Sequence, residues 1–193
     1  MRDRVRSLRA ALAHDEVRSI SRRYFISNGF DGTLTSIGVT MGAYLSGIAD
    51  GLTVVAIGLG AAVGLCTSGV WSVWEIERAE RRAQVANIER AMLTDLADTQ
   101  VTGRMRDART ISAVTSGLGP LVGILLPLLP YLLEGSTLTM FESTVVAVGT
   151  GVGTLFVFGA YMGTVAGLNP YVAGVRMGLA GFVVAGLNLV LPG

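Results

Sequence analysis

The chain of 193 residues is 51% hydrophobic and 15% charged, and its mean hydropathy is +0.57. Soluble domains carry about 25% charged residues, so this composition argues against a soluble protein and predicts an integral membrane protein. The net charge is +1, and every basic residue is an arginine: seven lie in 1–23, seven in 75–109, and the last is Arg176. Because positive-inside topology explains these clusters, no nucleic-acid partner is expected, and the single cysteine excludes an intrachain disulfide.

Residues 1–23 are polar and arginine-rich, and Val5, Leu8 and Leu12 recur at helical spacing. This pattern predicts a short cytoplasmic helix. The helix is either an interfacial anchor on the membrane surface or a solvated leader that only enforces topology. No secretory signal peptide is expected, because the apolar run that follows is too long for one.

Five apolar segments follow, each with roughly the 20 residues needed to cross about 30 Å of hydrocarbon. They predict an all-α fold with five transmembrane helices in a single membrane domain, 1–193. Asp50-Gly51 separates the first two, which predicts a tight helical hairpin, and Trp71 and Trp74 are expected at an interface. The expected spans are 24–48, 52–74, 111–133, 141–166 and 171–191.

Residues 75–109 interrupt the apolar pattern with charges of both signs, which predicts a short cytoplasmic helical insert between the second and third spans. The loop that carries Glu134 and Glu142 has no basic residue, so it is expected outside. With five spans, the N-terminus is therefore predicted in the cytoplasm and the C-terminus outside.

Many of the 26 glycines are four residues apart, a spacing that lets helix backbones approach closely in lipid. These glycines either pack helices within one chain or form the seam of a dimer. The pairs include Gly60/Gly64, Gly119/Gly123, Gly149/Gly153 and Gly159/Gly163. Three prolines in the third span predict a kinked or broken helix: Pro120, Pro127 and Pro130.

Asp31 lies about seven residues into the first span, where a carboxylate is costly unless it is paired, hydrated or protonated. Intramembrane acids of this kind are typical of ion or proton pathways. Alternatively, Asp31 is the N-cap of a helix that begins at Thr33. Arg176, the only base in an apolar span, either extends to the cytoplasmic interface or pairs with Asp31.

Cys66 lies late in the second span, beside the hydroxyls of Thr67 and Ser68. A thiol there could bind a transition-metal ion, although a lone buried cysteine often acts as a small hydrophobic residue. The hydroxyl of Ser72 is a weaker candidate for the same role.

Several acids of the 75–109 segment share helix faces, because residues three apart are neighbours on a helix. Converging carboxylates suit divalent cations, and a methionine makes such a site softer. The alternative is a solvated helix of mixed charge, since arginines interleave with the acids. The candidate metal ligands of this segment are Glu77, Glu80, Glu89 and Met92.

No phosphate-binding loop, histidine-based zinc motif or nucleophile elbow is found, so the chain is not expected to be an enzyme. A membrane-embedded enzyme acting on lipids is also disfavoured, because no nucleophile or histidine accompanies the arginines. The single histidine, His14, lies in the leader.

The stretch RRYFISNGFDGTLTSIGVTMGAYLSG at 22–47 resembles the start of the vacuolar iron transporter family, with the glycine–aspartate motif of that family at Gly29-Phe30-Asp31-Gly32. ERAERRAQ at 77–84 is similar to that family's acidic helix after the second span, and NPYVAGVRMG at 169–178 resembles its last span. The order of five spans matches as well. The chain is therefore identified as a divergent, short, prokaryotic-type member.

The resemblance implies a homodimeric exporter that moves ferrous iron or manganese out of the cytosol in exchange for protons, with no permanently bound cofactor. Asp31 would take the role of the family's first-span aspartate, and Glu77, Glu80, Glu89 and Met92 would collect metal. The family's second-span methionine is missing, and Cys66 stands near its place. Because of this departure, a non-transporting scaffold or metal sensor that keeps the fold is the alternative.

Overall fold

The computed structural model describes residues 15–92 and 100–190. The elements in this part are all helical, with no β-strand among them, which confirms the predicted all-α class. Residues 1–14, with most of the predicted leader, lie outside the described part, and 15–23 form the first turns of a longer helix. The elements are α2 (Asp15–Leu45), α3 (Gly51–Met92), α4 (Gln100–Leu128), the 3-10 helix η1 (Leu129–Leu133), α5 (Met140–Val165) and α6 (Pro170–Val190).

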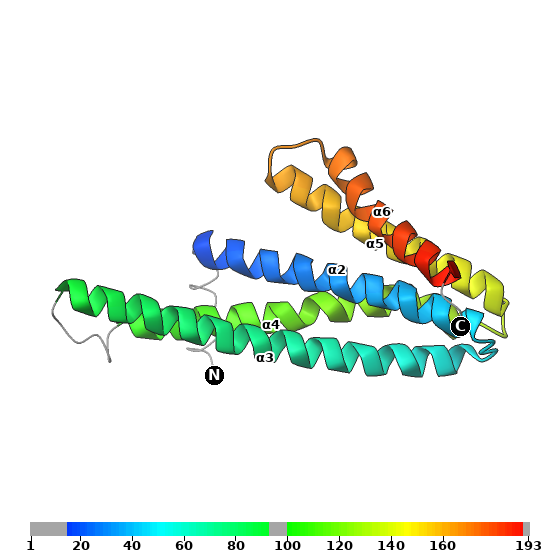
Figure 1. Ribbon diagram of the computed structural model, residues 1–193, viewed down its shortest axis with the longest axis horizontal. Helices are drawn as coiled ribbons and strands as arrows, with labels where there is room; N and C mark the ends of the chain where they lie inside the picture. Colours follow the sequence, from blue (N-terminus) through cyan, green and yellow to red (C-terminus); the bar gives the residue numbers. More distant parts are fainter. Residues whose placement is uncertain (1–14, 93–99, 191–193) are drawn as a thin grey trace.

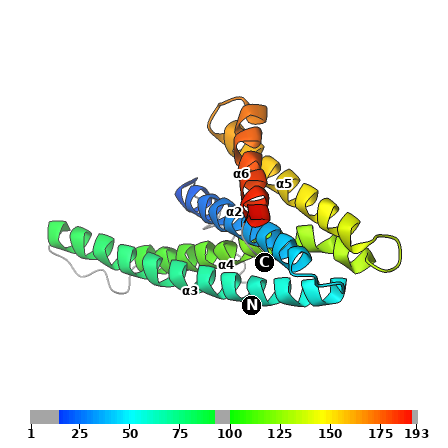
Figure 2. The same cartoon turned by 45° about the vertical axis from the view of Figure 1, so that its right-hand side comes forward.

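The helices form two groups, which Figures 1 and 2 show from two directions. Helices α2, α3 and α4 lie side by side, whereas α5 and α6 form a hairpin that packs on the other side of α2. Successive helices alternate in direction, so α2 begins at the end of the bundle where α3 finishes and α4 begins. Helix α6 finishes at the opposite end. The alternation agrees with the predicted topology, but the side of the membrane that each end faces stays a prediction.

Four helices of the described residues are long and apolar enough to cross a membrane, and they correspond to the second to fifth predicted spans. The chain is therefore an integral, multi-pass membrane protein. The predicted first span is α2, whose 31 residues extend about 46 Å at 1.5 Å per residue. Since α2 is too polar to qualify by composition, the fifth span stays a prediction.

The polarity of α2 has a structural explanation. Its hydroxyl residues Thr33, Ser36 and Thr40 are buried in the bundle. The Thr33 hydroxyl donates to the Gly29 carbonyl at 2.8 Å, and the Ser36 hydroxyl donates to the Ile124 carbonyl of α4 at 3.3 Å. Buried hydroxyls that are hydrogen-bonded in this way are tolerated at helix interfaces in membranes. Helix α2 contacts each of the helices α3, α4, α5 and α6, and a hydropathy scan underestimates a helix that buries polar side chains against its neighbours.

The predicted cytoplasmic insert is built from extensions of two spanning helices. Helix α3 has 42 residues and is about 63 Å long, roughly twice the thickness of the hydrocarbon core. It continues without a break to Met92, and α4 begins at Gln100, so both project beyond the other helices at one end (Figure 1). The structure therefore gives no support to a separate insert over 75–109.

The predicted hairpin between the first two spans is present, with only residues 46–50 between α2 and α3. Gly47 has a φ of 77°, a left-handed conformation that suits the end of a helix. The Asp50 carboxylate accepts a hydrogen bond from the Thr53 backbone N–H at 2.9 Å and so caps α3. Glu134, one of the two acids expected in an outer loop, accepts from the Gly51 N–H at 3.2 Å.

The prolines interrupt the third span as predicted, although only at its end. Pro120 and Pro127 lie inside α4, and the α-helix gives way to η1 at Leu129, one residue before Pro130. The hydroxyl groups of Tyr131 and Thr144 are 2.8 Å apart and link η1 to α5.

The glycine pairs divide into two kinds. A Cβ at Gly119 would lie 2.8 Å from the Gly29 nitrogen, and one at Gly123 would lie 2.9 Å from the Thr33 nitrogen, so this pair seats α4 directly on the α2 backbone. Gly159 likewise packs against α6. In contrast, a Cβ would meet nothing within 4 Å at the other two pairs, Gly60/Gly64 on α3 and Gly149/Gly153 on α5. Packing within one chain therefore explains Gly119/Gly123 and Gly159/Gly163. We call Gly60/Gly64 and Gly149/Gly153 the open pairs, because they leave room for contacts with other molecules.

Candidate functional site

Asp31 lies in the middle of α2, which is helical without interruption from Asp15 to Leu45. The alternative in which Asp31 caps a helix starting at Thr33 is therefore wrong. Its backbone carbonyl accepts the hydroxyl of Thr35 at 2.8 Å, as in the interior of a helix. The residue is exposed, and no ion pair between described residues includes it. A carboxylate at this depth is thus available to a ligand.

A small cavity of about 120 Å³ lies beside Asp31, at the contact of α2, α3 and α4. Helix α3 contributes two hydroxyls, Ser68 and Ser72, which are one helical turn apart and so lie on the same face. The complete lining consists of Asn28, Asp31, Leu65, Ser68, Gly69, Ser72 and Pro120. A carboxylate, an amide and two hydroxyls therefore surround one space that is large enough for a hydrated or partly hydrated ion.

One wall of this cavity is fixed by hydrogen bonds between the three helices. The Asn28 side-chain nitrogen donates to the Ser116 hydroxyl oxygen at 2.5 Å and lies 3.3 Å from the Ser116 carbonyl oxygen. The Ser116 hydroxyl donates in turn to the Gly69 carbonyl at 2.9 Å. Ser116 is fully buried, and a Cβ at Gly69 would lie 3.1 Å from its hydroxyl. The close contact of Gly69 with Ser116 and the hydrogen-bonded amide of Asn28 together fix how α2, α3 and α4 pack around Asp31.

Cys66 does not belong to the lining of this cavity. It is half-buried and faces α4, where its sulfur accepts a hydrogen bond from the Leu121 backbone N–H. Cys66 was the predicted metal ligand of this part of α3, whereas α3 presents Ser68 and Ser72 to the cavity beside Asp31. The spacing of the serines was the available signal. The contributions of Asn28 and Pro120 were missed, because nothing in the sequence indicates how α4 packs on α2.

Glu77 lies on the extension of α3 and is already occupied by partners. Its side chain is 4% exposed, and its carboxylate lies 3.2 Å from the guanidinium of Arg81, one helical turn away. The Tyr24 hydroxyl of α2 donates to the same carboxylate at 3.4 Å. A metal ion at Glu77 would therefore have to displace Arg81, so the observed contacts are those of a residue that ties α3 to α2.

The other candidates on the extension do not converge with Glu77. Glu80 is exposed, Glu89 is half-buried and makes an interaction of its own, and the side chain of Met92 lies outside the described part. Within residues 15–92 and 100–190, no group of three histidine, cysteine or acidic side chains could hold a metal ion. A multi-carboxylate metal centre is thus not preformed among these side chains.

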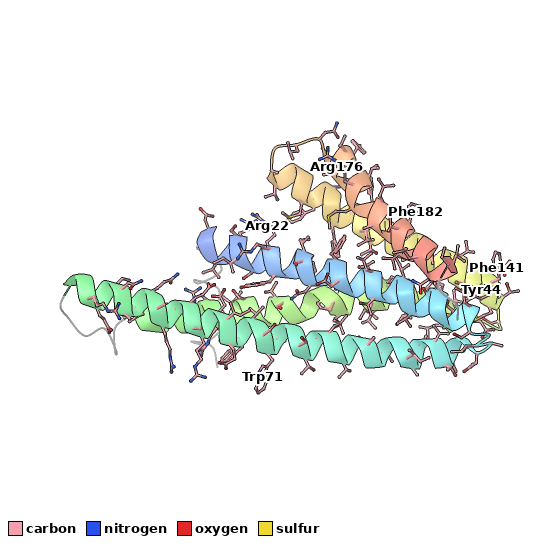
Figure 3. The ribbon with its side chains drawn as sticks, viewed as in Figure 1. Arg22, Tyr44, Trp71, Phe141, Arg176 and Phe182 are labelled. Atoms are coloured by element: carbon pink, nitrogen blue, oxygen red, sulfur yellow. The ribbon has the colours of Figure 1, made fainter. Side chains whose placement is uncertain are left out.

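The two tryptophans of α3 differ in their surroundings. Trp71 is 72% exposed and projects from α3 away from the other helices (Figure 3), as expected for a residue that faces lipid. Trp74 turns inward, and the guanidinium of Arg109 lies 4.0 Å from its ring centroid, a cation–π contact between α3 and α4. Only Trp71 therefore fits the predicted aromatic interface.

Arg176 is exposed near the start of α6, and among the described residues it forms no ion pair with Asp31 or any other acid (Figure 3). The alternative in which Arg176 neutralises Asp31 is therefore not observed. The long side chain of Arg176 is free to reach the nearest interface.

An unpaired acid beside a polar cavity, between the helices of a multi-pass bundle, is typical of membrane transport proteins. The VIT family matches residues 73–191, from the second half of α3 to the end of α6, so the matched part does not include Asp31. The chain belongs to this family, which confirms the resemblance found in the sequence and indicates membrane transport of metal ions. An uncharacterized protein of Methanocaldococcus jannaschii is 25% identical over 166 residues, 84% of each chain.

Proposed function

We propose that this protein is a secondary transporter that exports divalent metal ions, ferrous iron or manganese, from the cytoplasm in exchange for protons. The observation that carries the proposal is the Asp31 carboxylate, which faces a polar cavity and has no ion pair among the described residues. Membership of the VIT family supplies the class of cargo. The protein's own contribution is a single acid placed where helices α2, α3 and α4 meet.

Asp31 can alternate between a metal ion and a proton because each neutralises the same carboxylate. A carboxylate within a membrane is costly without a counter-charge, so the metal ion and the proton compete for this one group. No basic residue lines the cavity to compete for the acid. This exchange on one group couples the export of metal to the entry of protons.

The arginine-rich end of the bundle is the cytoplasmic end in this proposal. Arg18, Arg22 and Arg23 lie at the start of α2, and the extensions of α3 and α4 carry further arginines at the same end. The bias of arginine toward one end follows the positive-inside rule. Glu80, Glu89 and Met92 on the extension would then raise the local concentration of metal on the cytoplasmic side, whereas Glu77 would mainly position α3.

A homodimer would complete the metal site. Divalent cations of this class take about six ligands, and one chain offers a single carboxylate at the cavity. A second copy on the α3 side would add its own oxygen ligands. The open pair Gly60/Gly64 lies on that side and leaves room for close approach of another helix.

The direct test is metal uptake into proteoliposomes under an imposed proton gradient, with Mn²⁺ and Fe²⁺ as substrates. Asp31→Asn removes the charge with little change of shape, and uptake should fall to the level of empty liposomes. Glu75→Gln is the matched control, since Glu75 forms only an exposed ion pair with Arg78 at 3.5 Å. If Asp31→Asn retained uptake, or if the parent protein moved neither ion, the transport proposal would be rejected.

The alternative is a membrane scaffold or metal sensor that does not transport. It is favoured by one observation, the absence of a group of three acid, histidine or cysteine ligands among the described residues. Binding of Mn²⁺ to Asp31 without uptake under any gradient would select it. Uptake that requires both Asp31 and the gradient would exclude it.

A further inference from the structure

The side chains of the Asp31 cavity that could bind a cation would all do so through oxygen. The polar side chains in its lining are a carboxylate, an amide and two hydroxyls, from Asp31, Asn28, Ser68 and Ser72. No cysteine or methionine lines it. Every side-chain atom that could bind a cation there is therefore an oxygen. The amide nitrogen of Asn28 is a hydrogen-bond donor and cannot act as a ligand.

Hydrogen bonding fixes which atom of Asn28 is available. Its side-chain nitrogen is directed at Ser116, where one of its two contacts is a backbone carbonyl at 3.3 Å. A carbonyl can only accept, so the nitrogen has to be on that side, and the amide cannot be reversed without loss of the contact. The amide oxygen is left over, and it is a good ligand for hard cations.

The cysteine nearest in sequence to the cavity serines lies outside the cavity lining. Cys66 is two residues before Ser68, and its sulfur accepts a hydrogen bond from the Leu121 backbone N–H of α4. It does not contribute to the cavity. A soft metal ion in the cavity would therefore meet no sulfur ligand unless α3 rotated.

We propose, as an extension of the proposed function, that this cavity selects hard divalent cations. Carboxylate, amide and hydroxyl oxygens suit Mn²⁺, Mg²⁺ and Ca²⁺, whereas softer ions gain their affinity from sulfur and nitrogen ligands. Among transported ions Mn²⁺ is the substrate. Mg²⁺ and Ca²⁺ compete with it, and Cd²⁺, which prefers thiolate ligands, competes poorly.

The experiment measures Mn²⁺ uptake into proteoliposomes with Mg²⁺, Ca²⁺ or Cd²⁺ as competitor, in a Cys66→Ala background. Ser68→Cys places a thiol in the cavity, and Cd²⁺ should then inhibit at a concentration about tenfold lower, the scale on which ligand environments change metal affinity. Thr67→Cys is the matched control. Thr67 is the neighbouring residue and lines only the outer groove of α3, whereas Ser68 lines both that groove and the cavity.

Each outcome separates the two proposals. Stronger inhibition of the parent by Cd²⁺ than by Mg²⁺ and Ca²⁺, or equal Cd²⁺ sensitivity of Ser68→Cys and Thr67→Cys, would overturn the selectivity while leaving transport intact. Absence of Mn²⁺ and Fe²⁺ uptake would reject transport instead.

In that case the cavity is tested by binding of Mn²⁺ to the purified protein, measured by electron paramagnetic resonance. Binding that Asp31→Asn abolishes and Mg²⁺ displaces more readily than Cd²⁺ supports the inference, and any other result overturns it.

Discussion

Gly119 offers a direct measure of how closely α2 and α4 are packed. A Cβ at this position would lie 2.8 Å from the Gly29 nitrogen and closer still to the Phe25 carbonyl oxygen, whereas real Cβ contacts are rarely shorter than 3.4 Å. Both obstructing atoms belong to the backbone of α2, so no side chain can rotate away. In Gly119→Ala the two helices must separate by more than half an ångström, which strains the hydrogen bonds that Asn28 and Ser36 make to α4.

The expected cost follows from comparison with Gly60→Ala. Both substitutions gain up to about 1 kcal/mol of helix propensity, and a Cβ at Gly60 meets nothing within 4 Å. The difference between the two variants therefore isolates the steric term. Overpacking costs about 1–3 kcal/mol, and we expect the upper half of that range because the contacts are to backbone.

The assay is equilibrium unfolding of the purified protein in dodecyl maltoside micelles by titration with sodium dodecyl sulfate. The change in helical circular dichroism gives a free energy of unfolding for each variant. Gly119→Ala should be about 2–3 kcal/mol less stable than Gly60→Ala. Unfolding free energies that agree within about 0.5 kcal/mol, the usual size of surface effects, would refute the close packing of α2 on α4.

Three further predictions use the same unfolding assay. Ser116→Ala should lose about 1–3 kcal/mol, because two hydrogen bonds of this fully buried hydroxyl are removed and each contributes about 0.5–1.5 kcal/mol. Glu77→Gln should be destabilised by about 1–3 kcal/mol while Glu80→Gln is unchanged, since only the former breaks a largely buried pair. Hydrogen bonds from Thr53 hold the pKa of Asp50 below its ordinary value of 3.8. The cap of α3 should therefore stabilise the protein above the unfolded-state pKa and weaken as pH falls through the lower folded-state pKa, a loss that Asp50→Asn should abolish.

The membrane class, the helical hairpin and the importance of Asp31 could all be predicted from local features. Long apolar runs specify helices, and a charge within such a run stands out against a simple background. The N-cap alternative for Asp31 was a reasonable reading of Asn28-Gly29-Phe30-Asp31-Gly32, because two glycines flank the acid. It is wrong because the glycines serve α4, whose Gly119 and Pro120 press against the backbone of α2 there.

The composition of the cavity could not be predicted, because it depends on the rotation of α3 about its own axis. Cys66 and Ser68 are two residues apart, which places them about 200° apart around a helix. Only one of them can face Asp31, and apolar content does not decide which, since both faces of α3 are largely apolar. The contact of Gly69 with Ser116 fixes the rotation, and that contact joins residues 47 positions apart in the chain.

The two open glycine pairs mark two alternative surfaces at which a second copy of the chain could bind. Gly60/Gly64 lies on α3, next to the outer groove that shares Ser68 with the Asp31 cavity, whereas Gly149/Gly153 lies on α5. Only a seam along α3 brings two copies of the cavity together.

In the Cys66→Ala background, Gly60→Cys should therefore form an intermolecular disulfide on mild oxidation in membranes, because cysteines near a two-fold axis come within the roughly 5.5–6 Å between Cα atoms that a disulfide needs. Gly149→Cys is the matched control, because Gly149 is also exposed but lies on another helix, and this variant should stay monomeric on a non-reducing gel. Crosslinking of Gly149→Cys alone would place the seam on α5. Each cavity would then have to bind its cation with the oxygens of one chain and water, and the proposal that a second copy completes the site would fail.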